Sequence, residues 1–130
     1  MLLSRDQILK VDDLKTEDVD VPEWGGSVRL RMLTGAERDS FEQSMIDTRG
    51  GKQKTNLANF RARLIARCVV TDTGERMFSP PDIDALGRKS AAALGRLFDA
   101  CQRMNGFSAA DVEELTEGFG DAPSAPATFD

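Results

Sequence analysis

Residues 18–38, which read DVDVPEWGGSVRLRMLTGAER, constrain the fold more than any other part of this chain. Two stretches of alternating apolar and polar residues flank a Gly-Gly pair, which is the pattern of a β-hairpin. If Gly25 and Gly26 form a two-residue turn, the register of the two strands is fixed. The expected cross-strand pairs are Val21–Leu30, Val19–Met32 and Asp20–Arg31.

The predicted hairpin has one apolar face and one polar face. The apolar face contains Val19, Val21, Val28, Leu30 and Met32, and the polar face contains Asp20, Pro22, Trp24, Ser27, Arg29 and Arg31. Because Pro22 has no N–H to donate, the first strand should be short or lie at a sheet edge. The only tryptophan, Trp24, either closes the end of a small core or anchors a partner, and it could contact Arg29 through a cation–π interaction.

The rest of the chain favours helices separated by short turns. Ser4 and Thr34 are each followed three residues later by Gln or Glu, the sequence signature of a capped helix start. A later stripe at spacings of three and four residues consists of Leu57, Phe60, Leu64 and Cys68. We expect helices over residues 4–10, 34–47, 56–70, 79–87 and 90–104, a short helix from residue 108, and an exposed loop over residues 48–55.

These elements predict an α+β, mainly α fold in which an N-terminal β-hairpin packs with about four helices. We expect one domain over residues 1–117, followed by a disordered acidic tail over residues 118–130 that is rich in Gly, Pro and Ala. With 40% hydrophobic and 6% aromatic residues, the chain has a modest core. A monomer of this kind would be marginally stable and would be stabilised by association.

The net charge of −5 is distributed unevenly. Residues 1–26 hold three bases and seven acids, residues 27–78 hold ten and six, residues 79–107 hold four and three, and residues 108–130 hold no base and six acids. This alternation admits two interpretations. Opposite poles could bring copies or partners together, or each region could simply solvate its own surface.

The residue types offer little chemistry for catalysis. The chain contains no histidine and no tyrosine, which removes the commonest general base and the commonest metal ligand. Cys68 and Cys101 lack metal or redox spacing, so we expect buried free thiols, with a disulfide as the alternative. The sequence therefore predicts no enzyme activity, no catalytic residues, no cofactor and no metal. We also expect no membrane-spanning segment and an intracellular location.

A basic stretch in the middle of the chain gives the candidate partner-binding residues. It contains Arg49, Lys52, Lys54, Arg61, Arg63 and Arg67, to which the hairpin adds Trp24, Arg29 and Arg31. Such cations could hold phosphates, which makes a small nucleic-acid-binding regulator the alternative function. However, residues 49–67 contain one aromatic residue, Phe60, and the whole chain is acidic. Contact with an acidic protein surface, or a merely solvated face, is the stronger interpretation.

The VPEWGG turn, the basic second strand and the LTGAER helix start resemble the tail assembly chaperones of long-tailed bacteriophages and prophages. The resemblance covers roughly residues 1–107 and is strongest over residues 3–41. It implies a non-enzymatic protein of the host cytoplasm that binds the tape measure protein, helps recruit tail tube subunits and is absent from the mature virion. Self-association, and a longer frameshifted form that binds the tube, are further implications. A tail or head completion protein that stays in the virion is a second alternative.

Overall fold

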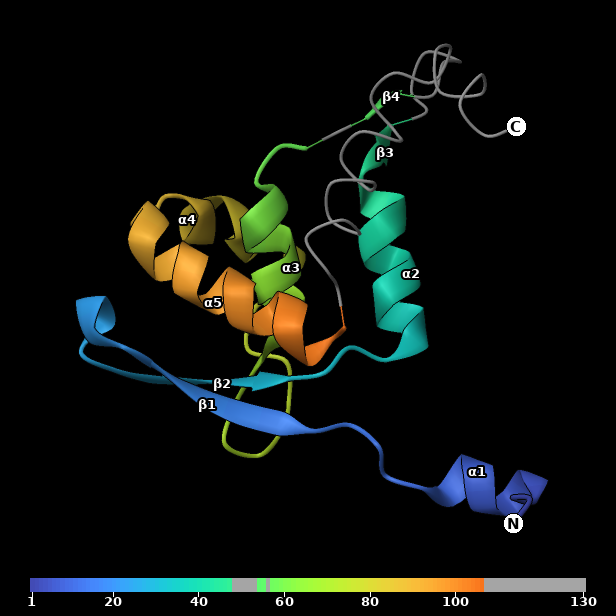
Figure 1. Cartoon of the computed structure of the whole chain (residues 1–130). Coiled ribbons are helices and arrows are strands. Elements are labelled where there is room, and N and C mark those ends of the chain that lie inside the picture. The colour runs from blue at the N-terminus through green and yellow to red at the C-terminus, as the bar shows by residue number, and fades with distance from the viewer. Residues whose placement is uncertain (48–53, 56, 107–130) are drawn as a thin grey trace.

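The structure is a computed structural model that describes residues 1–47, 54–55 and 57–106. Helices α3, α4 and α5 gather on one side of the hairpin strands β1 and β2, and α2 stands beside them (Figure 1). The short helix α1 lies away from this body at the N-terminus (Figure 1). The described part of the chain therefore has the predicted α+β, mainly α architecture.

The main sheet has three strands, one more than the predicted hairpin. Strands β1 (Thr16–Val21) and β2 (Gly26–Arg31) form the hairpin, and β5 (Val69–Val70) adds to the other side of β2 in the order β1-β2-β5. Both pairings are antiparallel. β1 is therefore an edge strand, as Pro22 at its end led us to expect.

The hairpin does not have the two-residue turn at Gly25 and Gly26 that we predicted. The turn is a 3₁₀ helix, η1 (Pro22–Trp24), closed by Gly25 in the left-handed region at φ 76°. The observed pairs include Asp18–Arg29, Val19–Val28 and Asp20–Ser27, so the register differs from the predicted one by four residues. Because four is an even number, the side chains keep their predicted faces. Val21 and Leu30 are buried in the core.

Two helices begin as predicted. Helix α1 (Arg5–Lys10) and helix α2 (Gly35–Ser44) each start with a complete capping box, in which the cap side chain and the third helical residue bond reciprocally to backbone N–H groups. Helix α2 is shorter than predicted, because residues beyond it form a second small sheet of β3 (Ile46–Asp47) and β4 (Lys54–Thr55). The predicted loop over residues 48–55 was therefore wrong at residues 54–55, which form strand β4.

Helix α3 (Phe60–Cys68) is also shorter than predicted. It begins after Asn59, whose backbone is left-handed at φ 53°, and it ends where Val69 and Val70 turn into strand β5. Leu57, which we expected on the buried stripe, precedes the helix and is 40% exposed. β-Branched valines suit a strand better than a helix end, which accounts for the early termination.

The second half of the described chain contains η3 (Pro80–Asp82), α4 (Ile83–Gly87) and α5 (Ala91–Met104). The predicted helix from residue 79 is thus a 3₁₀ turn followed by a short α-helix. Helix α5 begins as predicted, with Ser90 as its cap, and Gly106 at φ 72° follows its end. Helix α3 packs against α2, α4 and α5, and its residues 62–66 are all buried.

Among the described residues, the core is one cluster to which β1, β2, β5 and the helices α2 to α5 contribute. Its fully buried large side chains include Val21, Leu30, Phe41, Met45, Leu64, Ile65, Leu97 and Val69. Within the ranges that the structure describes, no helix is long and apolar enough to cross a membrane. The expected helix from residue 108 and the expected tail over 118–130 lie outside the described residues.

Candidate partner-binding surfaces

An apolar pocket opens beside the hairpin turn, and we name it the Trp24 pocket. It measures about 600 Å³ and is lined by Trp24, Met77, Phe78, Asp82, Ala85, Leu86 and Lys89. Trp24 is 38% exposed and Met77 is 50% exposed. The single tryptophan thus contributes to an open surface and does not close the core. This favours the interpretation of Trp24 as an anchor for a partner.

Local backbone geometry assembles this pocket. The proline-started η1 turn and the left-handed Gly25 present Trp24 at the end of the hairpin. The N–H of Met77 donates to the Val69 carbonyl at 3.1 Å, which holds the following segment against the end of α3. Asp82 accepts from the backbone N–H and the hydroxyl of Ser79, and these bonds fix the start of η3. The pocket wall is therefore backed by hydrogen-bonded segments.

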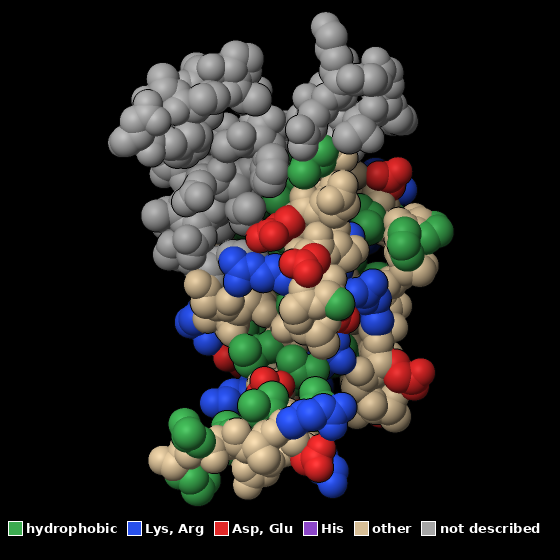
Figure 2. Space-filling view, turned by 90° about the vertical axis from the view of Figure 1, so that its right-hand side faces the viewer, with side chains coloured by type: hydrophobic (Ala, Val, Ile, Leu, Met, Phe, Trp, Pro, Cys, Tyr) green, Lys and Arg blue, Asp and Glu red, His purple; other side chains and the backbone are tan. Residues whose placement is uncertain are grey.

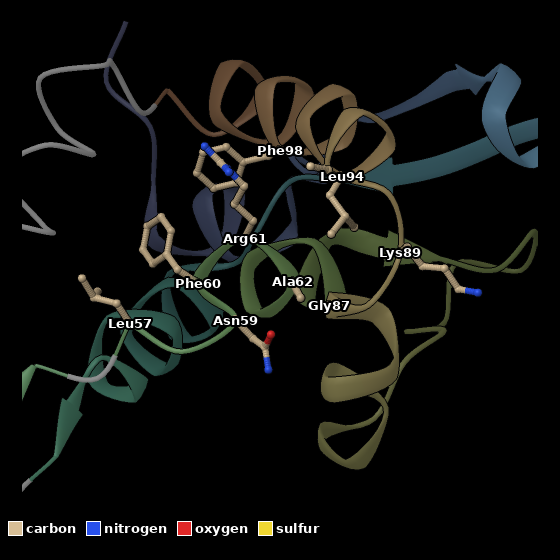
Figure 3. Close-up of a pocket in the computed structure, with 10 residues that line it drawn as sticks. Leu57, Asn59, Phe60, Arg61, Ala62, Gly87, Lys89, Leu94 and Phe98 are labelled. Carbon is tan, nitrogen blue, oxygen red and sulfur yellow. The ribbon is translucent and has the colours of Figure 1, made fainter.

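A second hollow lies between the start of α3 and the start of α5, and we name it the Phe60 groove. It measures about 500 Å³, and its lining includes Leu57, Phe60, Arg61, Gly87, Lys89, Leu94 and Phe98 (Figure 3). The ring of Phe60 lies 5.5 Å from that of Phe41 and 5.6 Å from that of Phe98 between centroids. This aromatic row gives the groove an apolar floor, while Arg61 and Lys89 contribute positive charge.

Asn59 fixes the junction between α3 and α4 at the edge of the Phe60 groove. Its side-chain amide donates to Asp84 at 2.8 Å and lies against Gly87 (Figure 3). A Cβ atom at position 87 would collide with the amide end of the Asn59 side chain, so a larger residue there would require Asn59 to move. We predicted Gly87 only as a helix end, and its contact with Asn59 was not foreseen.

The two hairpin arginines are held in ion pairs within the chain. Arg29 donates to both carboxylate oxygens of Asp18, at 2.7 and 3.1 Å, across the β1–β2 ladder. The hydrogen bond from Arg29 lowers the pKa of Asp18. We had predicted that Arg31 pairs with Asp20, and this was wrong: Asp20 accepts from the Ser27 hydroxyl instead. The predicted contact of Arg29 with Trp24 is replaced by the pair with Asp18.

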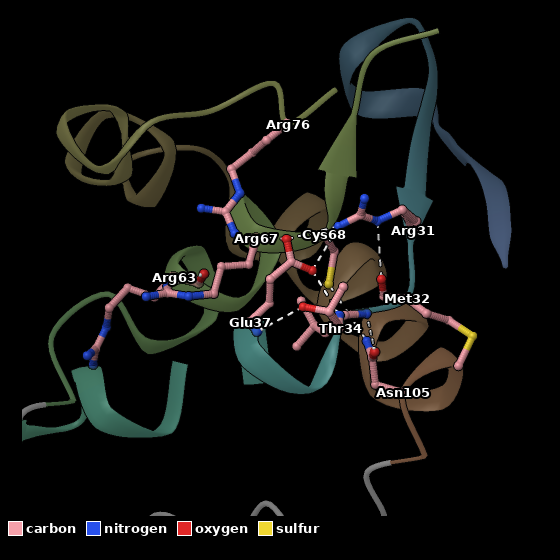
Figure 4. A network of polar contacts seen from close by, with 10 residues as sticks. Arg31, Met32, Thr34, Glu37, Arg63, Arg67, Cys68, Arg76 and Asn105 are labelled. Carbon is pink, nitrogen blue, oxygen red and sulfur yellow. Dashed lines mark hydrogen bonds and ion pairs between the residues drawn. The ribbon is translucent and has the colours of Figure 1, made fainter. Parts of the chain in front are cut away.

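Arg31 belongs to a polar network centred on Glu37 (Figure 4). Arg31 donates to the two carboxylate oxygens of Glu37 at 2.8 and 2.9 Å, and Arg76 donates to one of them at 3.3 Å. The N–H of Thr34 also donates to Glu37, at 2.9 Å. Burial alone would raise the pKa of Glu37, but the Thr34 N–H and the two guanidinium groups outweigh it and lower the pKa.

The three arginines of α3 do not share one face. Arg63 is buried and donates to the Ser44 carbonyl at 2.6 Å, whereas Arg61 is exposed and lies 5.5 Å from the Phe98 ring. Arg67 follows the Arg63 side, where it donates to the Arg63 carbonyl and lies over Phe41. Residues two apart on a helix point in nearly opposite directions. Arg63 therefore does not belong to an exposed basic face, and the split does not favour a phosphate-binding stripe.

The remaining candidates of the basic stretch cannot be placed in either hollow. Arg49 and Lys52 lie outside the described residues. Lys54 lies in strand β4, opposite Asp47, and only its backbone is described. The partner-binding role of all nine candidate residues remains a prediction.

Acidic residues of β1 and η1 pair with basic residues of α5. Glu17 accepts from Arg103 at 2.6 Å, and Glu23 accepts from Arg96 at 3.1 Å. These hydrogen bonds lower the pKa of both glutamates. Part of the negative charge of residues 1–26 is thus satisfied inside one copy. This arrangement favours the interpretation in which charges solvate or pair locally.

Cys68 and Cys101 are buried free thiols, as predicted. Their mutual hydrogen bond and burial raise the pKa of Cys101, and the same bond lowers that of Cys68. Asn105 connects them to the end of the sheet: its amide donates to the Cys101 carbonyl at 2.8 Å, and its oxygen accepts from the Leu33 N–H at 2.7 Å. Among the described residues, no group of three or more Cys, Asp or Glu could hold a metal ion.

A sequence model of a family described as phage tail assembly chaperone matches residues 7–117. The chain belongs to this family. Its fold is similar to that of the bacteriophage HK97 tail assembly chaperone, with a TM-score of 0.54 and 17% identity, over 76% of this chain and 90% of that one. At that identity the likeness concerns the fold alone. No curated protein gives a significant match.

Membership of the family confirms the resemblance drawn from the hairpin and the helix start that follows it. It gives the chain a chaperone role in phage tail assembly and implies tail proteins as partners. The two hollows described above are then surfaces where such partners could bind. Neither hollow was predicted as a hollow, because each joins residues that are far apart in the sequence.

Proposed function

We propose that this chain binds the tape measure protein, helps recruit tail tube subunits, associates with copies of itself and is absent from the mature virion. It does so in the host cytoplasm and without catalysing a reaction. The observation that carries this proposal is the family match over residues 7–117. The Phe60 groove supports it, since it offers an apolar surface that the described part of the chain leaves open.

The Phe60 groove suits an amphipathic helix. Its floor is formed by Phe60, Leu94 and Phe98, and Leu57 stands at its edge with 40% of its surface exposed. Grooves of this kind take the apolar face of a helix through anchors spaced three or four residues apart. A tape measure protein with an apolar helical stripe would bury that stripe here.

The charges of the groove favour an acidic partner. Arg61 is exposed and lies over the Phe98 ring, and Lys89 lines the same hollow. A carboxylate on the polar face of the bound helix could pair with either cation, which would favour one orientation. Burial of the partner's apolar stripe would prevent its aggregation until tube subunits displace the chaperone.

Co-expression with the tape measure protein of the same phage tests the proposal. We expect the chaperone to raise the soluble fraction of that protein, and Leu57→Asp to abolish most of the increase. Leu57 precedes α3 and is partly exposed, so the substitution should leave the fold intact. Ala92→Asp, on an exposed position of α5, is the matched control and should behave as the wild type.

An unchanged solubility of the tape measure protein in the presence of wild-type chaperone would refute the proposal. Purified phage particles give the second measurement. We expect the chain to be absent from them, and its presence in stoichiometric amount would favour a completion protein of the virion.

A further inference from the structure

Residues 1–11, which we name the N-terminal arm, are all exposed in the described part of the chain. Helix α1 has no buried residue. Ile8 is 54% exposed and Leu9 is 65% exposed, and Leu2, Leu3 and Val11 are exposed as well. Figure 2 shows apolar side chains standing free at the lower end of the molecule, where Figure 1 places α1. A free apolar arm of this kind is a surface for another molecule.

The arm nevertheless has strong helix-start signals. The Ser4 hydroxyl accepts from the Gln7 N–H at 3.2 Å, and the Gln7 side chain accepts from the Ser4 N–H at 2.8 Å. Leu3 and Ile8 occupy the two positions of a hydrophobic staple. A helix of six residues is marginal in water without tertiary contacts. The local sequence therefore favours a helix at this place. The described part of its own copy does not bury any residue of that helix, so a second molecule would have to supply the stabilising contacts.

The Trp24 pocket is the apolar surface that complements the arm. It offers the rings of Trp24 and Phe78 and the side chain of Met77, which is half exposed. Its charges also match those of the arm. Asp82 and Lys89 line the pocket, while the arm carries Arg5, Asp6 and Lys10 next to its apolar residues.

The arm does not reach the Trp24 side of the pocket in its own copy. The Met32 N–H donates to the Lys15 carbonyl at 3.0 Å and fixes the start of β1. From Lys15 to Trp24, strand β1 and η1 extend over about 26 Å, at about 3.3 Å per strand residue and 2 Å per 3₁₀ residue. The segment back to Leu9 spans at most about 20 Å. In Figure 1, α1 and the turn between β1 and β2 lie at opposite ends of the hairpin.

We propose that the N-terminal arm of one copy docks in the Trp24 pocket of a second copy. Ile8 and Leu9 enter the pocket between Trp24 and Met77, and Lys10 approaches Asp82. Because the arm and the pocket are different surfaces, this contact is heterologous. Repetition of a heterologous contact gives a closed ring or an open helical filament.

This inference rests on the self-association included in the proposed function and names the surfaces that mediate it. It is tested on the pure chaperone, without any tape measure protein. Its failure would therefore leave the tape measure binding intact, and a failure of the co-expression experiment would leave this contact intact.

Analytical ultracentrifugation of three full-length variants provides the test. The arm variant carries Ile8→Asp and Leu9→Asp, the pocket variant carries Met77→Asp, and the control carries Ala92→Asp. All four positions are exposed, so each variant should fold. We expect concentration-dependent assembly of the wild type and the control. The arm and pocket variants should each show an apparent dissociation constant at least tenfold higher.

A mixture of the arm variant with the pocket variant sharpens the test. One partner then supplies an intact pocket and the other an intact arm, so we expect a 1:1 dimer and no larger species. A wild type that stays monomeric at high concentration would overturn the proposal, as would unchanged assembly of the arm variant. Loss of assembly in the arm variant alone, with the pocket variant unaffected, would also overturn it, because the arm would then dock elsewhere.

Discussion

Helices α1 and α2 begin with the same kind of cap but differ in whether they pack against the body of the molecule. Each has a hydroxyl cap, Ser4 or Thr34, and a third residue, Gln7 or Glu37, that bonds back to the cap. Helix α2 runs for ten residues and buries Phe41, whereas α1 runs for six and buries nothing. The cap thus determines where a helix starts. Whether the helix stabilises its own domain depends on its tertiary contacts.

The largest expected difference between the two helices concerns apolar side chains. Phe41→Ala should lower the free energy of unfolding by about 3–5 kcal/mol, since Phe41 is 1% exposed and its ring packs against Phe60. Ile8→Ala in α1 should change it by less than about 0.5 kcal/mol. Urea denaturation at a protein concentration low enough to keep the chain monomeric measures both.

A loss of more than about 1 kcal/mol in the Ile8 variant would break the comparison. It would mean that α1 contributes to the stability of a single copy. The corresponding inference about the arm would then lose its starting point.

The same comparison shows how far the sequence determines the fold. Capping signals predicted the starts of α1, α2 and α5 correctly, because the bonds involved lie within four residues. The period of two predicted the faces of the hairpin correctly, although its register was wrong. The register depends on the turn, and a Pro-started 3₁₀ turn takes up residues that we had assigned to the strands.

The remaining errors come from contacts between distant segments. We read α3 as a helix with one apolar stripe, but α2, α4 and α5 all pack on it, which leaves Arg63 buried. Strand β5 exists because β2 lies beside it, and no local pattern gives that neighbour. The candidate surfaces were missed for the same reason. Trp24 was identified from its residue type, whereas Met77 and Phe78 join it only through the tertiary fold.

The second prediction compares the third residues of the two helices. Glu37→Gln keeps an acceptor for the Thr34 N–H but removes the charge that Arg31 and Arg76 contact. We expect the variant to be less stable by about 1 kcal/mol at pH 7, since the group is only partly buried. The matched change in α1, Gln7→Glu, should have a smaller effect, because Gln7 is exposed.

The pH dependence of this difference has a definite sign. The folded-state pKa of Glu37 lies below its ordinary value of 4.5, so its stabilising effect is complete above that pH. It is lost as the pH falls through the folded-state pKa. Urea denaturation of the wild type and the Glu37→Gln variant, from pH 7 to pH 3, should show two stabilities that converge on acidification. A constant gap would indicate that the charge of Glu37 does not account for the network.

The effect expected of the caps themselves is no larger than that of Glu37. Thr34 accepts from the Glu37 N–H at 3.0 Å, and Ser4 accepts from the Gln7 N–H at 3.2 Å. Thr34→Ala should lower the free energy of unfolding by about 1 kcal/mol. Ser4→Ala removes the same bond, yet it should act only on α1 and leave global stability within about 0.5 kcal/mol.

Amide hydrogen exchange separates the local effect from the global one. In the Ser4→Ala variant, the Ile8 amide, which donates to the Ser4 carbonyl at 3.0 Å, should exchange faster while the amides of α3 keep their rates. In the Thr34→Ala variant, slow amides throughout the body should exchange faster together, because their protection depends on global unfolding. Equal effects of the two cap substitutions on the exchange of the α3 amides would show that α1 is energetically coupled to the body. In that case α1 would stabilise its own copy, as α2 does, and would not be available to a second copy.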